Sequence, residues 1–401
     1  FEENDSRAIL YVYSFISGAD WADEVARLDR MSKITKQDVV EWANKYLGPE
    51  SYAIIYKREG KDPDEQKIAA PKITPIVTNR DSQSEFLSEI QTSQVQPIEP
   101  VFVDYKKDMS QFEAQPGIDV LYKKNETNDI FTLIYVFNTG TENDPALNLA
   151  FNYLSYLGTD KMTAEEIASE MYDIACSFYM NAGANQSSIQ ITGLSENMGK
   201  AMEIVEGLIA GAKPDEAILE NCKADMLKSR ADAKLNQSRC FGALQRYLFY
   251  GGDFIRRTTL TDPALQALTS EQLLAKIGGL MGKQHEVLYY GPQKEAEVKS
   301  ALAEHHKVAA DLQPLEKKFS TLLPTDANKV VLAQYDAKQL YYLQFSNRGE
   351  KFDVAADPEI TLYNEYFGGG MNTIVFQEMR EARGLASVSY THLRAHETEL
   401  H

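Results

Sequence analysis

Two histidine-containing segments have a spacing that could bind a metal ion. His392 and His396 lie four residues apart with a glutamate beside them, which on a helix would bring two zinc ligands to adjacent turns. In the second segment, Glu304 and His305 end a run in which Ala301 takes the place of the first histidine of an H-x-x-E-H motif. Alanine cannot ligate a metal, so we interpret that run as the surface of a charged helix. No complete H-x-x-E-H occurs in the chain.

The composition excludes several classes of protein. The chain has 401 residues, with 41 Lys and Arg against 59 Asp and Glu and a formal charge of −18. Because so acidic a protein repels nucleic-acid phosphates, we expect no nucleic-acid partner. No run of about 18 apolar residues occurs, so we expect no membrane span. The three cysteines, Cys176, Cys222 and Cys240, provide neither a disulfide framework nor a C-x-x-C motif.

Local patterns predict the elements that must position any site. Residues 120–124 and 130–138 are predicted to be strands joined as a hairpin, and 177–182 and 188–192 to be two further strands. Thr163 and Glu166 form a capping box that begins a helix. The other predicted helices are 35–47, 84–90, 144–157, 197–209, 214–237, 269–281, 358–367 and 372–383, and the other predicted strands are 51–56, 285–290, 329–334 and 339–346.

The chain also repeats itself. Ile34–Tyr56 aligns without gaps on Leu268–Tyr290, and the apolar positions of the two segments coincide. A second match joins the regions around Tyr153 and Tyr363, each followed five residues later by glycine. Any capped amphipathic helix followed by a strand would give the first match. Two matches in the same serial order favour a duplicated αβ domain.

One phrase carries a resemblance to a known family. Phe376–Ala386 reads FQEMREARGLA and follows the glycine run at Gly368–Met371. This resembles the insulinase/pitrilysin family of zinc metallopeptidases, the inverzincins. The resemblance implies an α+β fold of repeated αβ domains, each a mostly antiparallel sheet packed with helices. Family proteins have two related halves, each of two such domains, which close like a clamshell around a peptide.

On that map the chain is an internal fragment, truncated at both ends. The expected parts are a tail of a second αβ domain (1–60), an inter-half linker (61–105), a third αβ domain (106–312), the front of a fourth αβ domain (313–387) and a non-native tail (388–401).

The family's H-x-x-E-H motif is degenerate in the expected third domain. Its place, judged from the Leu-Gly-Thr that follows, is occupied by Leu149, Asn152 and Tyr153. Leucine cannot ligate zinc, so we expect no metal site and no catalytic residue in this chain. The resemblance implies that the zinc of the intact protein lies in the absent N-terminal half.

The resemblance also implies an arginine and a tyrosine, seven residues apart, that reach the substrate. Arg380 occupies the arginine position, and a guanidinium can fix a peptide carbonyl. Ser387 stands where the tyrosine is expected. Arg380 is therefore the candidate substrate-binding residue, against the alternative of an exposed helix residue that pairs with a neighbouring glutamate.

The histidine-rich end is interpreted as non-native. Three of the six histidines fall within residues 388–401, where the family phrase breaks off. Val388–Thr398 resembles the in-frame translation of a transposase adapter used to prepare sequencing libraries. We therefore assign no zinc site to His392 and His396.

These expectations combine into one functional hypothesis. The intact protein would be a zinc peptidase, and this fragment would be inactive alone while it contributes peptide binding and chamber closure. Its partners would be peptide substrates and the missing N-terminal half or a separate catalytic subunit. The alternative is a non-catalytic structural or partner subunit of the same family. The resemblance suggests a periplasmic or otherwise extracytoplasmic location.

Overall fold

The computed structural model describes residues 3–48, 50, 52–57, 60, 83–97, 99–315, 320–337, 339–349 and 353–385. The chain divides into two compact units, Phe1–Phe102 and Val103–His401, which are described separately. The linker residues 61–82, Ser387, His392 and His396 lie outside the described residues.

The described part of the first unit is helical. Its helices are α1 (Asn4–Ser17), α2 (Trp21–Val25), α3 (Arg27–Met31), α4 (Lys36–Tyr46) and α5 (Glu85–Thr92). The helix predicted from Thr35 is α4, and it begins with a capping box in which the Thr35 hydroxyl accepts from the Asp38 N–H and the Asp38 carboxylate accepts from the Thr35 N–H. The strand predicted at 51–56 is wrong over its described part, because Tyr52–Lys57 has no strand beside it in this unit.

The second unit contains a six-stranded sheet. Its strands are β1 (Ser110–Gln115), β2 (Ile118–Lys124), β3 (Ile130–Phe137), β4 (Cys176–Ala182), β5 (Ser187–Leu194) and β6 (His285–Gly291). The spatial order is β1-β2-β6-β3-β5-β4. Only the β2–β6 pair is parallel, and the other four pairs are antiparallel. The α+β class with a mostly antiparallel sheet is thus confirmed.

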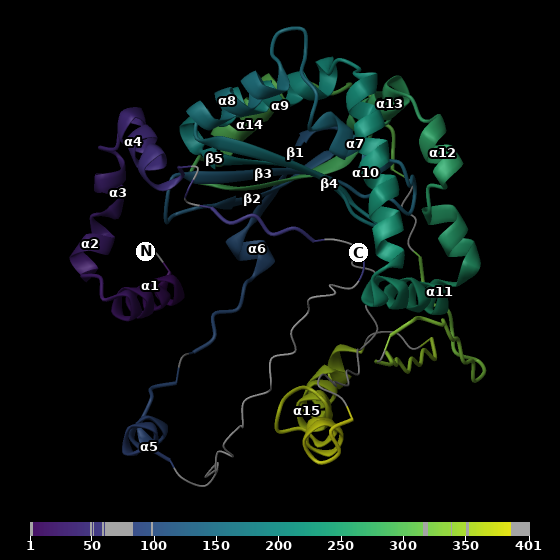
Figure 1. Cartoon of the computed structure of the whole chain (residues 1–401). Coiled ribbons are helices and arrows are strands. Elements are labelled where there is room, and N and C mark those ends of the chain that lie inside the picture. The colour runs from purple at the N-terminus through teal and green to yellow at the C-terminus, as the bar shows by residue number, and fades with distance from the viewer. Residues whose placement is uncertain are drawn as a thin grey trace. The chain divides into compact units, whose positions relative to one another are not determined.

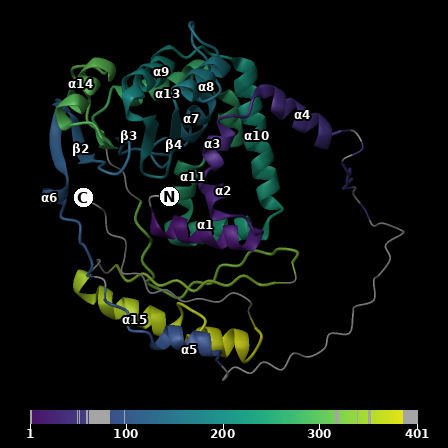
Figure 2. The same ribbon diagram turned by 90° about the vertical axis from the view of Figure 1, so that its left-hand side faces the viewer.

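Helices cover one face of this sheet. Figures 1 and 2 both show α8 (Ala164–Asp173), α9 (Met198–Gly211) and α13 (Ser270–Met281) on the same side. α7 (Leu147–Leu154) and α14 (Glu295–His305) join them there, and α7 contacts both α13 and β4. Alternate residues of β3, from Phe131 to Phe137, are fully buried under these helices, as the two-residue period of a strand requires.

The remaining elements of the second unit extend beyond the sheet. They are α6 (Tyr105–Asp108), α10 (Glu216–Lys234), α11 (Gln237–Thr258), α12 (Asp262–Ala267), α15 (Asp357–Phe367), three-residue turns of 3-10 helix at Ser195–Asn197 and Val354–Ala356, and a π-helical turn at Phe376–Glu381. α11 is kinked at Gly251, whose φ of 80° an L side chain rarely adopts.

The predicted hairpin is wrong. β2 and β3 do not pair, because β6 lies between them, parallel to β2 and antiparallel to β3. β6 fits this central place because its alternate residues Val287 and Tyr289 enter the buried core while Leu288 stays half-buried on the other face. A strand from 160 residues further along the chain has therefore displaced the local pairing that the sequence favours.

The strands predicted at 329–334 and 339–346 are also wrong. Both segments are described, and neither forms a ladder. Residues 339–346 are held to α11 instead, through the ring pairs Phe241–Tyr341 and Phe249–Phe345, and the Lys329 ammonium lies 5.3 Å from the ring centre of Tyr247 on the same helix. The domain boundaries proposed from the sequence stay predictions.

Candidate functional site

The degenerate motif lies on α7, and its three positions do not share one environment. Leu149 and Tyr153 are fully buried in the core, whereas Asn152 is exposed. The Tyr153 hydroxyl accepts a hydrogen bond from the Asp215 N–H at 2.7 Å and lies 2.8 Å from the Ser270 Oγ. A phenol thus links the first turn of α10 to the first turn of α13. Tyr153 is a structural residue here.

These residues do not fit a zinc ion. A leucine side chain offers no ligand atom, and the Tyr153 oxygen already has protein partners. No group of three His, Cys, Asp or Glu side chains that could hold a metal occurs in the part of the chain that the structure describes. We therefore derive no step through a metal for this chain.

A groove of about 270 Å³ lies between α7 and β4. We call it the edge-strand groove; its lining residues are Asn148, Phe151, Asn152, Ser155, Phe178, Tyr179, Met180, Asn181 and Ala182. None of them is charged. Asn148, Asn152 and Ser155 follow one another at helical spacing, so they form a polar stripe along one face of α7. Of the motif positions, only Asn152 lies in this groove.

β4 is the last strand of the sheet, and its outer edge carries backbone groups. The Leu194 N–H donates to the Ala175 carbonyl at 3.3 Å, and the Gly183 N–H donates to the Gln186 carbonyl at 2.8 Å. Alternate residues form the hydrogen-bonded pairs of an antiparallel ladder, so the odd-numbered residues of β4 bond to β5. The N–H and C=O groups of Phe178 and Met180 therefore point toward the free edge, beside the α7 stripe.

The two edges of the sheet differ in protection. Edge strands are usually protected by charge, proline, a bulge or a covering element. The β1 edge has two of these devices, a register shift after Glu113 and the Lys299 ammonium 4.3 Å from the Phe112 ring centre. β4 reads CSFYMNA and has no charged residue and no proline. An unprotected edge of this kind is a template for one more strand.

Arg380 lies in the turn Phe376–Glu381. Its guanidinium stacks 4.6 Å from the Phe376 ring centre, and its Nε lies 3.7 Å from the Glu381 carboxylate. These partners come from its own helical turn, and 43% of its side chain is exposed. The structure does not bring Arg380 together with the residues of the α7 motif through any contact among the described residues. Its substrate-binding role stays a prediction.

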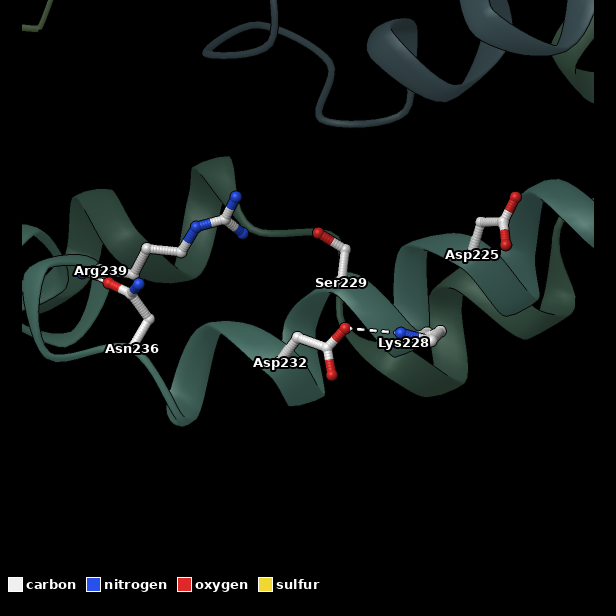
Figure 3. A pocket seen from close by; sticks show the side chains of 6 residues that line it. All are labelled: Asp225, Lys228, Ser229, Asp232, Asn236 and Arg239. Atoms are coloured by element: carbon white, nitrogen blue, oxygen red, sulfur yellow. Dashed lines mark hydrogen bonds and ion pairs between the residues drawn. The ribbon is translucent and has the colours of Figure 1, made fainter. Parts of the chain in front are cut away.

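A second hollow, of about 350 Å³, lies where α10 ends and α11 begins. Figure 3 shows its lining: Asp225, Lys228, Ser229, Asp232, Asn236 and Arg239. The Lys228 ammonium pairs with Asp232 at 2.7 Å, and the Asn236 side chain accepts from the Arg239 N–H at 3.0 Å as the cap of α11. Each interaction is local to one helix or its cap, so this hollow is the weaker candidate.

Sequence reasoning missed the edge-strand groove. It placed a strand at 177–182 correctly but gave no strand order, and only the order makes β4 an edge. The composition of this segment was the available signal. A seven-residue strand without charge or proline is either a central strand or an edge strand that can pair with another chain.

Comparison with known proteins shows a shared fold. No model of a protein family and no curated protein matches the sequence. Among solved structures, a protease from Helicobacter pylori matches with a TM-score of 0.53 and 13% identity over 72% of this chain and 71% of that one. A peptidase M16 inactive domain from Pseudomonas fluorescens matches with a TM-score of 0.53 and 18% identity over 70% of each chain. A conserved protein from Enterococcus faecalis V583 matches with a TM-score of 0.54 and 14% identity over 69% of this chain and 70% of that one.

At these identities the likeness concerns the fold. It agrees with the α+β architecture expected from the sequence, and two of these three structures are described as a protease or a peptidase domain. Among the described residues, no helix is long and apolar enough to cross a membrane.

Proposed function

We propose that this chain is the peptide-binding, non-catalytic part of an insulinase-type zinc peptidase. The observation that carries the proposal is the unprotected edge of β4 beside the polar stripe of α7, in a fold shared with a peptidase and with a peptidase inactive domain. Zinc and the attacking water would come from another polypeptide, either the N-terminal half or a separate catalytic subunit.

The edge-strand groove suits an extended peptide. A peptide that adds to β4 would exchange backbone hydrogen bonds with Phe178 and Met180, which requires no particular peptide sequence. The exposed amides of Asn148 and Asn152 can donate to peptide carbonyls or accept from peptide N–H groups. Because no lining residue is charged, we expect affinity to depend little on peptide charge.

Arg380 would act at a second contact with the same substrate. Its guanidinium has several donors in a planar array, which can hold a peptide carbonyl in place. Its side chain contacts Phe376 and Glu381 of its own helical turn, and the 43% of it that is exposed is available to a ligand. We give it a substrate-binding role and no chemical step.

In the proposed domain layout, residues 1–60 are the tail of an αβ domain, so they would pack against the rest of that domain. At the spacing of the internal repeat, Val39 and Tyr46 of α4 match Leu273 and Leu280 of α13. Leu273 and Leu280 are each less than 8% exposed, whereas Val39 and Tyr46 are each at least 50% exposed. We propose that residues 1–60 complete a further αβ domain, whose sheet would cover α4 and pair with residues 52–57, and so help to close the chamber.

A binding assay with the chain as it exists tests the peptide proposal. A fluorescein-labelled, unstructured peptide of about ten residues should bind in fluorescence anisotropy, and the same peptide should not be hydrolysed in the absence of an added catalytic subunit. A scrambled peptide of equal composition is the matched control and should bind similarly, since backbone groups dominate recognition. Failure of both peptides to bind would refute the proposal.

A purely structural partner subunit is the second candidate. The burial of Leu149 and Tyr153 in the core favours it, because these two motif positions then serve packing alone. Such a subunit would bind no peptide and would co-purify in a fixed ratio with a catalytic subunit. An extracytoplasmic location belongs to either proposal, and cell fractionation with an antibody against the chain tests it.

A further inference from the structure

A buried polar chain joins three elements of the second unit. His306 follows α14, and its Nδ1 lies 2.5 Å from a carboxylate oxygen of Glu206 on α9. The Nε2 of His306 lies 2.9 Å from the Nε2 of His285, the first residue of β6. The Nδ1 of His285 lies 2.7 Å from the Lys283 carbonyl. His285 and His306 are 4% and 6% exposed.

The partners fix where the protons are. A carbonyl only accepts, so the Nδ1 of His285 carries hydrogen and donates to Lys283. In a neutral ring, the Nε2 of His285 then accepts, so the Nε2 of His306 must be the donor. One further proton lies between the Nδ1 of His306 and Glu206. The whole chain is satisfied with His285 neutral, and it has no place for another proton.

A fall in pH therefore disturbs this chain of bonds by protonating His285. A second proton on that ring would sit on Nε2 and face the N–H of His306, so that two donors would oppose each other. Burial is the largest cause that lowers the pKa of His285, to about 4, and the neighbouring His306 lowers it further while the Lys283 carbonyl and Glu206 act in the opposite direction. In solvent the ordinary value is about 6.5.

The other groups packed around the two rings do not supply a compensating charge. The Tyr135 ring of β3 lies 4.3 Å from the His306 ring, and burial with the nearby Glu206 raises the pKa of that phenol well above its usual value, so it stays neutral. Phe137 of β3 lies 4.7 Å from the His285 ring and is apolar. His305 faces away, with its ring against Gly199 and near Glu304. Glu206 is the charged partner, and His306 already uses it.

The same histidines hold the end of the αβ body in place. After His306 the chain returns beside the loop that precedes β6: the Gln284 N–H donates to the Gln313 carbonyl at 2.8 Å, and the Gln313 N–H donates to the Gly282 carbonyl at 3.0 Å. Residues 306–315 are thus held to β6 by His306 and to the loop before β6 by this backbone pair, and the buried Leu312 between them packs in the core. Described residues from 320 onward follow this segment toward α11.

We propose that the Glu206–His306–His285 chain is an acid-sensitive latch, which holds residues 306–315 on the αβ body at neutral pH and releases them when His285 is protonated. Release would loosen the connection between the sheet and the part of the chain that follows. The inference is independent of the proposed peptide binding, because none of these residues lines the edge-strand groove.

Proton linkage gives the direction and the size of the pH effect on release of residues 306–315. The latched state binds the extra proton with a pKa of about 4 and the released state with a pKa of about 6.5. The released state therefore gains protons first as the pH falls, and release becomes about 20-fold more favourable between pH 7 and pH 5.

Hydrogen exchange of the intact chain tests the latch. Exchange rates, corrected for the intrinsic pH dependence, give protection factors for the Gln284 and Gln313 amides and for the β5 amides Ile189 and Ile191, which report on global opening. We expect the first pair to lose about 20-fold in protection between pH 7 and pH 5 while the β5 pair is unchanged. A pH-independent protection of Gln313, or a parallel loss in β5, would overturn the proposal.

Two variants sharpen the test. His285→Gln removes the ring that takes up the proton, so the protection of the Gln313 amide should no longer change between pH 7 and pH 5. His305→Gln changes the neighbouring histidine outside the chain of bonds and should leave the profile unaltered. An equal effect of both substitutions would contradict the assignment.

Discussion

Replacing Met180 by proline should weaken peptide binding at the edge of β4 about 30-fold and leave the sheet folded. The Met180 N–H points away from β5, so its loss removes no hydrogen bond from the ladder. A bound peptide would lose that bond, and the proline ring would displace the neighbouring carbonyl of the peptide. Two backbone bonds at about 1 kcal/mol each correspond to a Kd about 30-fold weaker.

Tyr179→Pro is the matched control, one residue away. The Tyr179 N–H faces β5 opposite Gln190, so proline there breaks the ladder. The Tyr179 side chain is 64% exposed, so little packing is lost with it. We expect a cost of about 3 kcal/mol in the free energy of unfolding for Tyr179→Pro. For Met180→Pro we expect about 1 kcal/mol, from lost contacts of a half-buried side chain.

Anisotropy titrations with a labelled peptide and urea denaturation of each variant measure the two effects. Met180→Pro should lose more affinity for the peptide, and Tyr179→Pro should lose more stability, because the two N–H groups point to opposite sides of β4. Peptides methylated at single backbone nitrogens add a second check, since alternate positions should lose affinity. Unchanged binding by Met180→Pro, or equal stability of the two variants, would refute the assignment of the free edge.

Three further outcomes follow from the site. Tyr153→Phe leaves the Asp215 N–H without its buried acceptor and should lower the free energy of unfolding by about 2 kcal/mol in urea denaturation. The purified chain should contain less than stoichiometric zinc by elemental analysis, and a chelator should not shift its Tm; a chelator-dependent Tm would show a metal site. Arg380→Ala should weaken peptide binding about tenfold through one lost charge-assisted bond, with Arg380→Lys in between and unchanged circular dichroism in both.

Elements with local signals could be predicted from the sequence. The capping box at Thr163 placed the start of α8 to the residue, because an N-cap and its partner lie three residues apart, and the predicted helix from Thr269 likewise begins at its N-cap. β4 and β5 were found in the same way, from short runs of strand-forming residues between turns. In each case the deciding interaction is made within a few residues of chain.

Strand order could not be predicted, and the site depends on it. The insertion of β6 between β2 and β3 brings together residues more than 160 positions apart, and no local pattern reports such a pairing. It is nevertheless the reason that His285 meets His306. The same limitation hid the free edge of β4, whose sequence alone is compatible with a central strand.

The repeated segments show how far the environment decides the fate of a sequence. α4 and α13 share a threonine cap, a capping box and an apolar face, so local physics makes both of them helices. α13 packs on α7 and α9 and buries Leu273 and Ile277 completely, while β6 after it is held between two strands. α4 buries no residue, and residues 52–57 after it form no ladder. The difference lies in what surrounds each copy, since an amphipathic helix gains most of its stability from the surface that it covers. We therefore propose that the apolar face of α4 is one side of a core whose other side is a sheet like that of the second unit.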